Sequence, residues 1–140
     1  MLRHSKFLKP PAGPSLIYFL KNISTFRLNC LVYGETIERA FPVDIPMAKT
    51  VGDLKEMIKI KQQPKFDRFT ANELDVWKVN IPSNYPENPF LKVLEENPMA
   101  DIEGALKGVK ATNPLSEVGD YWQEPCKYNI QVIVEPPCKW

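Results

Sequence analysis

Hydrophobic and polar positions alternate between residues 26 and 46, which predicts two neighbouring β-strands. The first strand places polar Arg27 and Asn29 on one face. Its opposite, apolar face consists of Phe26, Leu28, Cys30 and Val32. Gly34 marks a turn, and a second alternating strand follows over residues 41–45. Pro42 indicates an edge position for this second strand, because proline has no N–H for a neighbouring strand. We expect the two strands to pair as a hairpin.

A helix is predicted to begin after Thr50. The Thr50 hydroxyl can accept a hydrogen bond from the Asp53 backbone, while the Asp53 carboxylate reaches back, as in a capping box. A stripe of side chains then recurs at three- and four-residue steps and consists of Val51, Leu54, Met57, Ile58 and Lys61. Pro64 ends the helix soon afterwards. The stripe is expected to pack on the hairpin.

Two further strands are predicted in the second half of the chain. Residues 74–79 are β-branched and aromatic, and Ile81-Pro82 ends this third strand. The proline-punctuated stretch from 82 to 125 is interpreted as one or two brief helical turns packed under a long loop. In the last strand, Tyr128, Ile130, Val132 and Val134 are expected to share one face and to alternate with Asn129, Gln131 and Ile133.

The order strand, strand, helix, strand, irregular crossover, strand predicts an α+β fold. We expect a ubiquitin-like β-grasp roll, with a mixed sheet of four to five strands and one main helix. The long crossover allows the last strand to insert parallel to the first. The predicted organisation is an extension over residues 1–25, expected to be disordered, a folded domain over 26–137, and a tail over 138–140.

Composition is typical of a globular domain whose charges are nearly balanced, so the molecule as a whole has no strong electrostatic field. The 140 residues are 44% hydrophobic and 25% charged, with a net charge of +1. We therefore expect no nucleic-acid partner for this domain. The apolar run over residues 16–20 is shorter than the roughly 7–15 residues of a secretory core or the about 20 of a membrane span. The N-terminal segment is interpreted as a disordered extension or a misplaced start, with a weak targeting signal as the alternative.

Residues for catalysis or metal binding are sparse. The cysteines are Cys30, Cys126 and Cys138, and His4 is the only histidine, so neither a zinc site nor a Ser-His or Cys-His pair is expected. We expect reduced thiols, with a Cys126–Cys138 disulfide as the alternative in an oxidising compartment. The acidic pairs Glu95-Glu96 and Asp101-Glu103 are interpreted as solvated loop charges. The chain contains no phosphate-binding GxxxxGK[ST] motif, so we predict a non-enzyme without metal or cofactor.

A specific resemblance rests on two stretches in combination, "KTVGDLKEMIK" at the helix start and "LDVWKVNIP" over the third strand. With the closing strand, they make the chain resemble, over about residues 26–137, the N-terminal domain of Crinkler effector proteins, in a form closer to fungal members. The resemblance implies a secreted effector whose N-terminal domain supports export or entry into host cells. A separate C-terminal domain then acts inside the host, often in its nucleus, and family members usually continue into it.

The resemblance also implies a site on the third strand. Oomycete members carry an LFLAK-type translocation motif there, and this chain has Leu74, Asp75, Val76, Trp77 and Lys78 at that place. The leading Leu and final Lys are retained. Leu74 and Val76 are expected to be core residues, whereas Trp77 and Lys78 are the candidates for an exposed contact.

A basic pair on the helix is a second candidate. Lys55 and Lys59 are four residues apart and are expected on its outer face. We favour a solvated face, with a phosphate or acidic-lipid contact as the alternative.

The leading functional hypothesis is a non-catalytic N-terminal domain for secretion and host translocation, lacking the C-terminal effector domain and located outside the microbe or in the host cell. The alternative is a stand-alone ubiquitin-like module that binds a host or endogenous protein through a sheet face or an edge strand. A third hypothesis is a truncated gene product.

Overall fold

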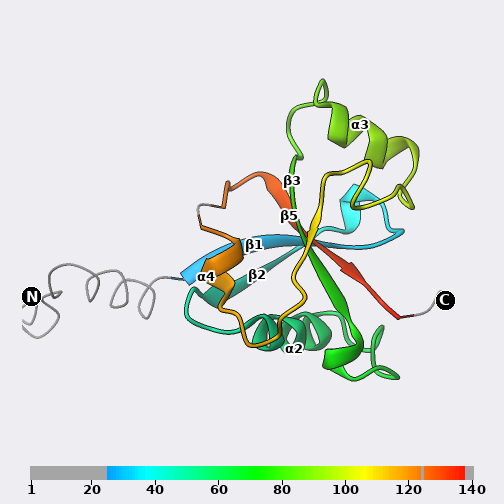
Figure 1. The fold of residues 1–140 in the computed structure, drawn as a ribbon. Helices are drawn as coiled ribbons and strands as arrows, with labels where there is room; N and C mark the ends of the chain where they lie inside the picture. The colour runs from blue at the N-terminus through cyan, green and yellow to red at the C-terminus, as the bar shows by residue number, and fades with distance from the viewer. Residues whose placement is uncertain (1–24, 124, 138–140) are drawn as a thin grey trace, which may run out of the picture.

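The computed structural model describes residues 25–123 and 125–137, which form one five-stranded mixed sheet with helices on both faces (Figure 1). The strands are β1 (Thr25–Val32), β2 (Phe41–Pro46), β3 (Asp75–Pro82), β4 (Val109–Lys110) and β5 (Asn129–Glu135). The helices are α2 (Val51–Lys61), α3 (Pro89–Glu96) and α4 (Val118–Tyr121), and the short 3-10 turns are η2 (Ile37–Arg39) and η3 (Ala71–Glu73). The predicted disordered extension and the tail lie outside the described residues, apart from Thr25.

The strand order β2-β1-β5-β3-β4 is that of a β-grasp roll. β1 and β2 pair antiparallel as the predicted hairpin, and β5 inserts between β1 and β3, parallel to the first and antiparallel to the second. The predicted α+β, ubiquitin-like fold is therefore confirmed. Pro42 lies on the edge strand β2, as its missing N–H requires.

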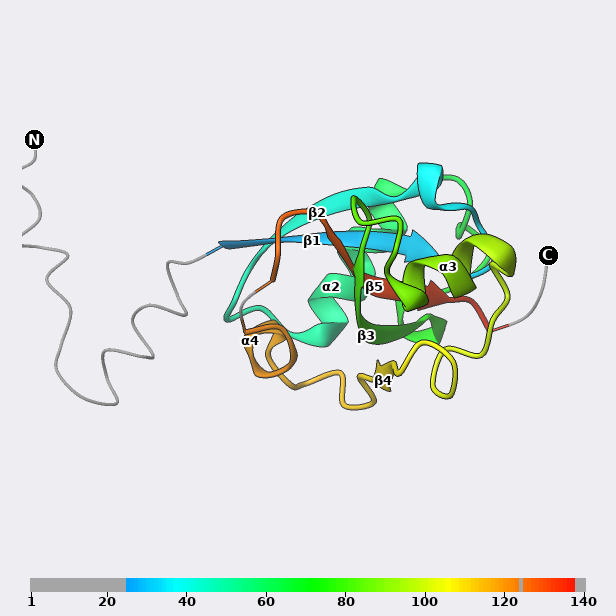
Figure 2. The ribbon, with the colours of Figure 1, turned by 90° about the horizontal axis from the view of Figure 1, so that it is seen from above.

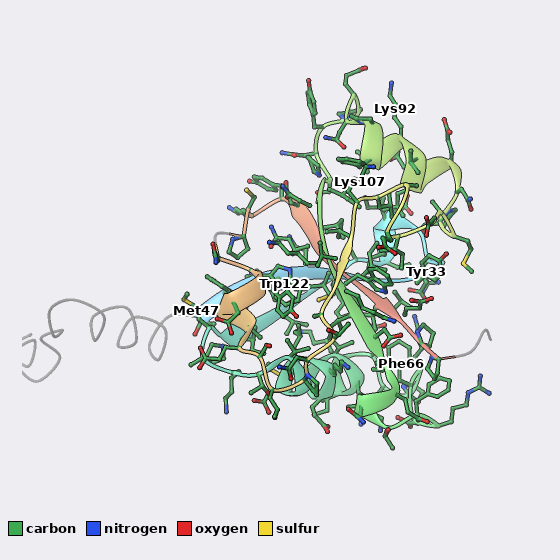
Figure 3. All side chains as sticks on the ribbon, in the orientation of Figure 1. Tyr33, Met47, Phe66, Lys92, Lys107 and Trp122 are labelled. Carbon is green, nitrogen blue, oxygen red and sulfur yellow. The ribbon has the colours of Figure 1, made fainter. Side chains whose placement is uncertain are left out.

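The start of α2 follows the predicted capping box. Thr50 Oγ1 accepts from the Asp53 N–H at 3.1 Å, and the Thr50 N–H donates to Asp53 Oδ2 at 3.1 Å. The prediction that Lys61 belongs to the apolar stripe is wrong, because this residue is exposed. α2 ends at Lys61, and Phe66 from the following turn fills the core instead (Figure 3). The ammonium group thereby stays in water, where its solvation free energy is retained.

Two hydrophobic cores form, one on each face of the sheet. The first lies between the sheet and α2 and contains Leu28, Leu54 and Val76. The second lies on the opposite face, where Leu91 and Leu94 of α3 cover Ile133 of β5. Figures 1 and 2 show α2 and α3 on opposite sides of the sheet. The segment from 82 to 125, predicted as brief turns under a loop, contains α3, β4 and α4, and its first part closes the second face of the sheet.

The expected strict alternation of β5 is wrong at one point. Val132 and Val134 face the core under α2, but Ile130 faces the α3 side together with Ile133. The reason is a bulge: Asn29 pairs with Ile130 and the next residue of β1 pairs with Val132, so Gln131 is an extra residue in β5. One extra residue reverses the side on which all preceding side chains of a strand point.

Candidate functional site

The translocation-like segment of residues 74–78 begins at the end of η3 and continues into β3. Leu74 and Val76 are completely buried in the core under α2, which confirms their expected core position. Replacing either side chain would change the packing of the fold, so neither is available for contact with a partner. Leu74 itself precedes the strand, which begins at Asp75 and ends at Pro82, where the Ile81-Pro82 pair was predicted to end it.

Trp77 is half-buried and its polar atom is already paired. Its indole Nε1 donates to Glu135 Oε1 at 3.0 Å, and the Lys110 ammonium lies 5.5 Å from the ring centroid. Lys110 also approaches Asp75, with 3.4 Å between Nζ and Oδ2. The ring packs against the core on the α3 side of the sheet. Trp77 is therefore a bridge between β3, β4 and β5 more than an exposed contact.

Lys78 is the exposed residue of the segment. By strand alternation it lies on the same face as Val76, and it lines a cavity of about 280 Å³ together with Asn80, Gln131 and Cys126. Trp122, which follows α4, forms another wall of this cavity. Figure 3 shows Trp122 between α4 and the sheet. The last residue of the translocation-like segment thus borders a hollow with both polar and apolar walls.

Sequence reasoning missed one buried residue that lines this cavity. Gln131 is buried and sits in the bulge of the central strand β5. Its signal in the sequence is a single polar residue within the apolar run Ile130 to Val134. Alternation alone assigns it to a polar face, and the bulge depends on pairing with strands that are distant in sequence.

The predicted exposed pair on α2 is wrong for Lys55, which is only 6% exposed. Gly52, one helical turn earlier on the same side of α2, donates its N–H to Pro114 O at 3.0 Å. The segment after β4 therefore runs along this side of the helix, and the expected outer face is partly covered. Lys59 is half-buried. The two residues do not form an open basic patch, and a contact of Lys59 with phosphate stays a prediction.

The two described cysteines differ in environment. Cys30 is fully buried under α2, and this burial raises the pKa of its thiol well above the usual range. Cys126 is exposed at the cavity rim, with a free thiol. Cys138 and His4 lie outside the described residues, and so does the disulfide considered for Cys126 and Cys138.

The acidic pairs lie at the surface. The side chains of Glu95, Glu96 and Glu103 are exposed, and Asp101 Oδ2 accepts from the Gly104 N–H at 2.9 Å. Over residues 25–123 and 125–137, no group of three or more His, Cys, Asp or Glu side chains is placed to hold a metal ion. In the same ranges, every helix is too short or too polar to cross a bilayer.

Comparison with known proteins identifies the family. Residues 26–135 match the model of the Crinkler effector protein N-terminal domain. Crinkler effector protein 1 from Rhizophagus irregularis (strain DAOM 181602 / DAOM 197198 / MUCL 43194) is 34% identical over 110 residues, which are 79% of this chain and 21% of that relative. The chain thus spans about a fifth of that protein's length.

Among solved structures, the C-terminal ubiquitin-like domain of mouse tubulin-specific chaperone e is similar. Its TM-score is 0.48 at 10% identity, covering 84% of this chain and 91% of that domain. The fold assignment itself rests on the strand order and helix placement described above. The family match spans the chain from β1 through the end of β5. The chain belongs to the Crinkler effector family, and its residues 26–135 are the N-terminal domain of that family.

Proposed function

We propose that this chain acts as a non-catalytic delivery domain that supports secretion and entry into a host cell. The observation that carries the proposal is the extent of the family match, which covers most of this chain but only 21% of the curated relative. A role in the host would then belong to sequence beyond this domain. The effector family favours a location outside the microbe or within the host cell.

The arrangement of residues 74–78 supports a role of this domain as a stably folded carrier. Two of the five side chains are core residues, and two more are engaged with Lys110 and Glu135. Lys78 is left as the side chain through which this segment would meet an export or uptake component. The absence of a histidine beyond His4 in the sequence favours a non-enzyme.

A reporter experiment tests the delivery role. The chain is fused at its C-terminal end to a fluorescent or enzymatic reporter and produced in the microbe, and reporter signal is measured inside host cells. We expect delivery by the wild-type chain and reduced delivery by Lys78→Ala. Lys92→Ala is the control, because Lys92 is also an exposed lysine but lies on α3, on the opposite face of the sheet (Figure 1).

Two outcomes contradict the proposal. If the reporter fused to the wild-type chain stays in the microbe under conditions where other effectors are delivered, the delivery role is wrong. If Lys78→Ala and Lys92→Ala both deliver the reporter as the wild type does, the role of the translocation-like segment is wrong, while the delivery role stands.

The alternative of a protein-binding module has one supporting observation, the cavity beside Lys78. A broad contact through an open sheet face does not fit, because α2 and α3 cover the two faces. A module of this shape would have to use the edge of the sheet. Specific binding of a partner by the isolated chain, without a fused effector domain, would support this alternative.

A further inference from the structure

Gln131 carries a buried acceptor that the fold leaves unused. The residue is 4% exposed, and its side-chain Nε2 donates to the Cys126 carbonyl oxygen at 3.3 Å. Only the amide nitrogen can donate to a carbonyl oxygen, so this bond identifies which terminal atom of the side chain is nitrogen and which is oxygen. The oxygen, Oε1, has no hydrogen-bond partner among the residues that the structure describes. Buried side-chain oxygens are almost always paired with protein or with water, so Gln131 Oε1 is free to accept a hydrogen bond from a donor that enters the cavity.

The sheet is irregular on both sides of Gln131. Against β1, Gln131 is the extra residue between the pairs Asn29–Ile130 and Cys30–Val132. Against β3, the register steps from Lys78–Val132 to Ile81–Ile130, so two residues of β3 face this one residue. Bulges of this kind re-aim a side chain and are frequent beside binding sites. Here the bulge turns Gln131 toward the cavity bordered by Lys78 and Asn80.

The walls of the cavity are held in place by hydrogen bonds within the chain. Trp122 Nε1 donates to the Gln131 carbonyl oxygen at 2.9 Å, which fixes the indole wall against the bulge. The Asn80 side-chain oxygen accepts from the Asn129 amide. The volume is about 280 Å³, just below the roughly 300–1,000 Å³ of pockets for drug-sized ligands. The space suits one amino-acid side chain and is too small for a nucleotide or a large cofactor.

The polar groups of the cavity define the chemistry of its occupant. Gln131 Oε1 requires a donor, whereas the ammonium of Lys78 requires an acceptor. A carboxylate would match Lys78 but supply no donor, and an ammonium would be repelled by Lys78. A primary amide has an NH₂ donor and a carbonyl acceptor in one planar group, so it satisfies both residues.

The edge of the sheet beside the cavity indicates a polypeptide as the source of this amide. β4 pairs only with Trp77 and Lys78, although β3 continues to Pro82. The Ala111 N–H donates to Val76 O, so the main-chain groups of Val76 point toward β4. The main-chain N–H and C=O groups of successive residues point to alternate edges of a strand. Those of Asn80, four residues after Val76, therefore also point to the β4 edge, at a position that β4 does not pair with in the described register. Gly108, directly before β4, still lies beside Val79, and the described pairing between β3 and β4 ends at Lys78, so an extended segment can pair with β3 as an added strand only from Asn80 onward.

We propose that this cavity binds the side-chain amide of an Asn or Gln residue presented by an extended polypeptide segment that pairs with β3 at Asn80. The amide NH₂ donates to Gln131 Oε1, and its carbonyl accepts from Lys78. This site goes beyond the proposed delivery role and does not depend on entry into a host, because it is a property of the folded chain itself.

The test uses the full chain, labelled with ¹⁵N, and three capped peptides of sequence acetyl-Val-Xaa-Val-N-methylamide with Xaa as Gln, Glu or Leu; the N-methyl cap avoids a second primary amide at the C-terminus. The main-chain amides are the same in all three, and only the Gln peptide carries the matching side chain. We expect the Gln peptide to shift the signals of the Gln131 side-chain NH₂, the Trp122 indole N–H and the Asn80 backbone N–H. The Glu and Leu peptides should bind about fivefold or more weakly, the loss expected when one buried hydrogen bond goes unmade.

Two variants separate loss of the site from loss of the fold. Gln131→Met keeps a similar side-chain volume and removes Oε1, so it should abolish the preference for the Gln peptide. Lys78→Met changes an exposed side chain and should weaken the Gln peptide several-fold in a chain that unfolds at the wild-type temperature. Lys92→Met is the control and should bind as the wild type does.

Equal affinity for the three peptides, or shifts confined to signals away from Gln131, Trp122 and Asn80, would overturn the proposal. Retained Gln preference in Lys78→Met and Gln131→Met would do the same. These measurements need no host cell, so their failure leaves the delivery role standing, and a failed delivery experiment leaves this binding site standing.

Discussion

The indole Nε1 of Trp77 donates a 3.0 Å hydrogen bond to Glu135 Oε1, joining residues 58 positions apart across the β3–β5 pair. Lys110 lies over the same ring from the other neighbouring strand, β4. The tryptophan of the translocation-like segment therefore holds three strands together. This use of the side chain explains why a residue expected at an exposed contact is half-buried.

Trp77→Phe should lower the free energy of unfolding by about 1 kcal/mol, the usual net value of one hydrogen bond. Phenylalanine preserves most of the ring packing but has no donor for Glu135. Urea denaturation of the two proteins measures the difference. Tyr85→Phe, at an exposed loop position, should leave the midpoint unchanged. An unchanged midpoint for Trp77→Phe would show that water replaces the indole bond without loss.

Leu91→Ala should destabilise the fold by about 2–4 kcal/mol, because it leaves a cavity in the core between α3 and the sheet. Leu115 is a control of the same residue type that is 80% exposed, so Leu115→Ala should change stability by less than about 0.5 kcal/mol. Thermal or urea unfolding compares the pair. Similar small effects for both would mean that α3 does not stabilise the domain.

Thr50→Ala should cost about 1 kcal/mol, because the first turn of α2 loses the side-chain acceptor for the Asp53 N–H. Thr112→Ala is a suitable control, since Thr112 is exposed in the connection after β4. Chemical denaturation gives the two values. An effect of Thr50→Ala no larger than that of the control would contradict a stabilising role for the capping box.

Cys30 should make the stability depend on pH in the alkaline range. Burial raises the pKa of its thiol in the folded state, so the folded chain keeps this proton while the unfolded chain releases it from about pH 8.5 upward. The free energy of unfolding should therefore be fully retained below that pH and fall above it. Urea midpoints between pH 7 and 10 measure the slope. Cys30→Val should remove this part of the slope, and an identical slope in the variant would disprove the role of Cys30.

The same difference in burial predicts selective alkylation. At pH 8, iodoacetamide should modify Cys126 in the folded chain and leave Cys30 intact until the protein is unfolded in urea. Peptide mass mapping assigns the modified position. Modification of Cys30 at the same rate as Cys126 would mean that the core under α2 opens readily.

Local patterns in the sequence were sufficient for the elements whose causes are local. The capping box of Thr50 and Asp53 needs only residues three positions apart, and the edge position of Pro42 follows from its missing N–H. Alternation in β1 likewise predicted the buried face that includes Leu28 and Cys30. The order of these elements along the chain then led to the correct fold class.

Features of the candidate site depended on contacts between distant parts of the chain. The Gln131 bulge arises because β5 must match β1 on one side and β3 on the other, and neither register is visible in residues 129–135 alone. Lys55 is covered by a segment about sixty positions away in the sequence. α3 packs on a sheet face that the alternation pattern had assigned as polar or had not assigned at all.

The sequence by itself therefore determined the type and order of the elements, because hydrogen bonds and side-chain periodicity within each element follow from neighbouring residues. Only the tertiary structure decided which side chains line the cavity and which are buried. Burial and register are set by packing between elements. That packing brings together residues that are far apart in the sequence, and no local pattern indicates which of them will meet.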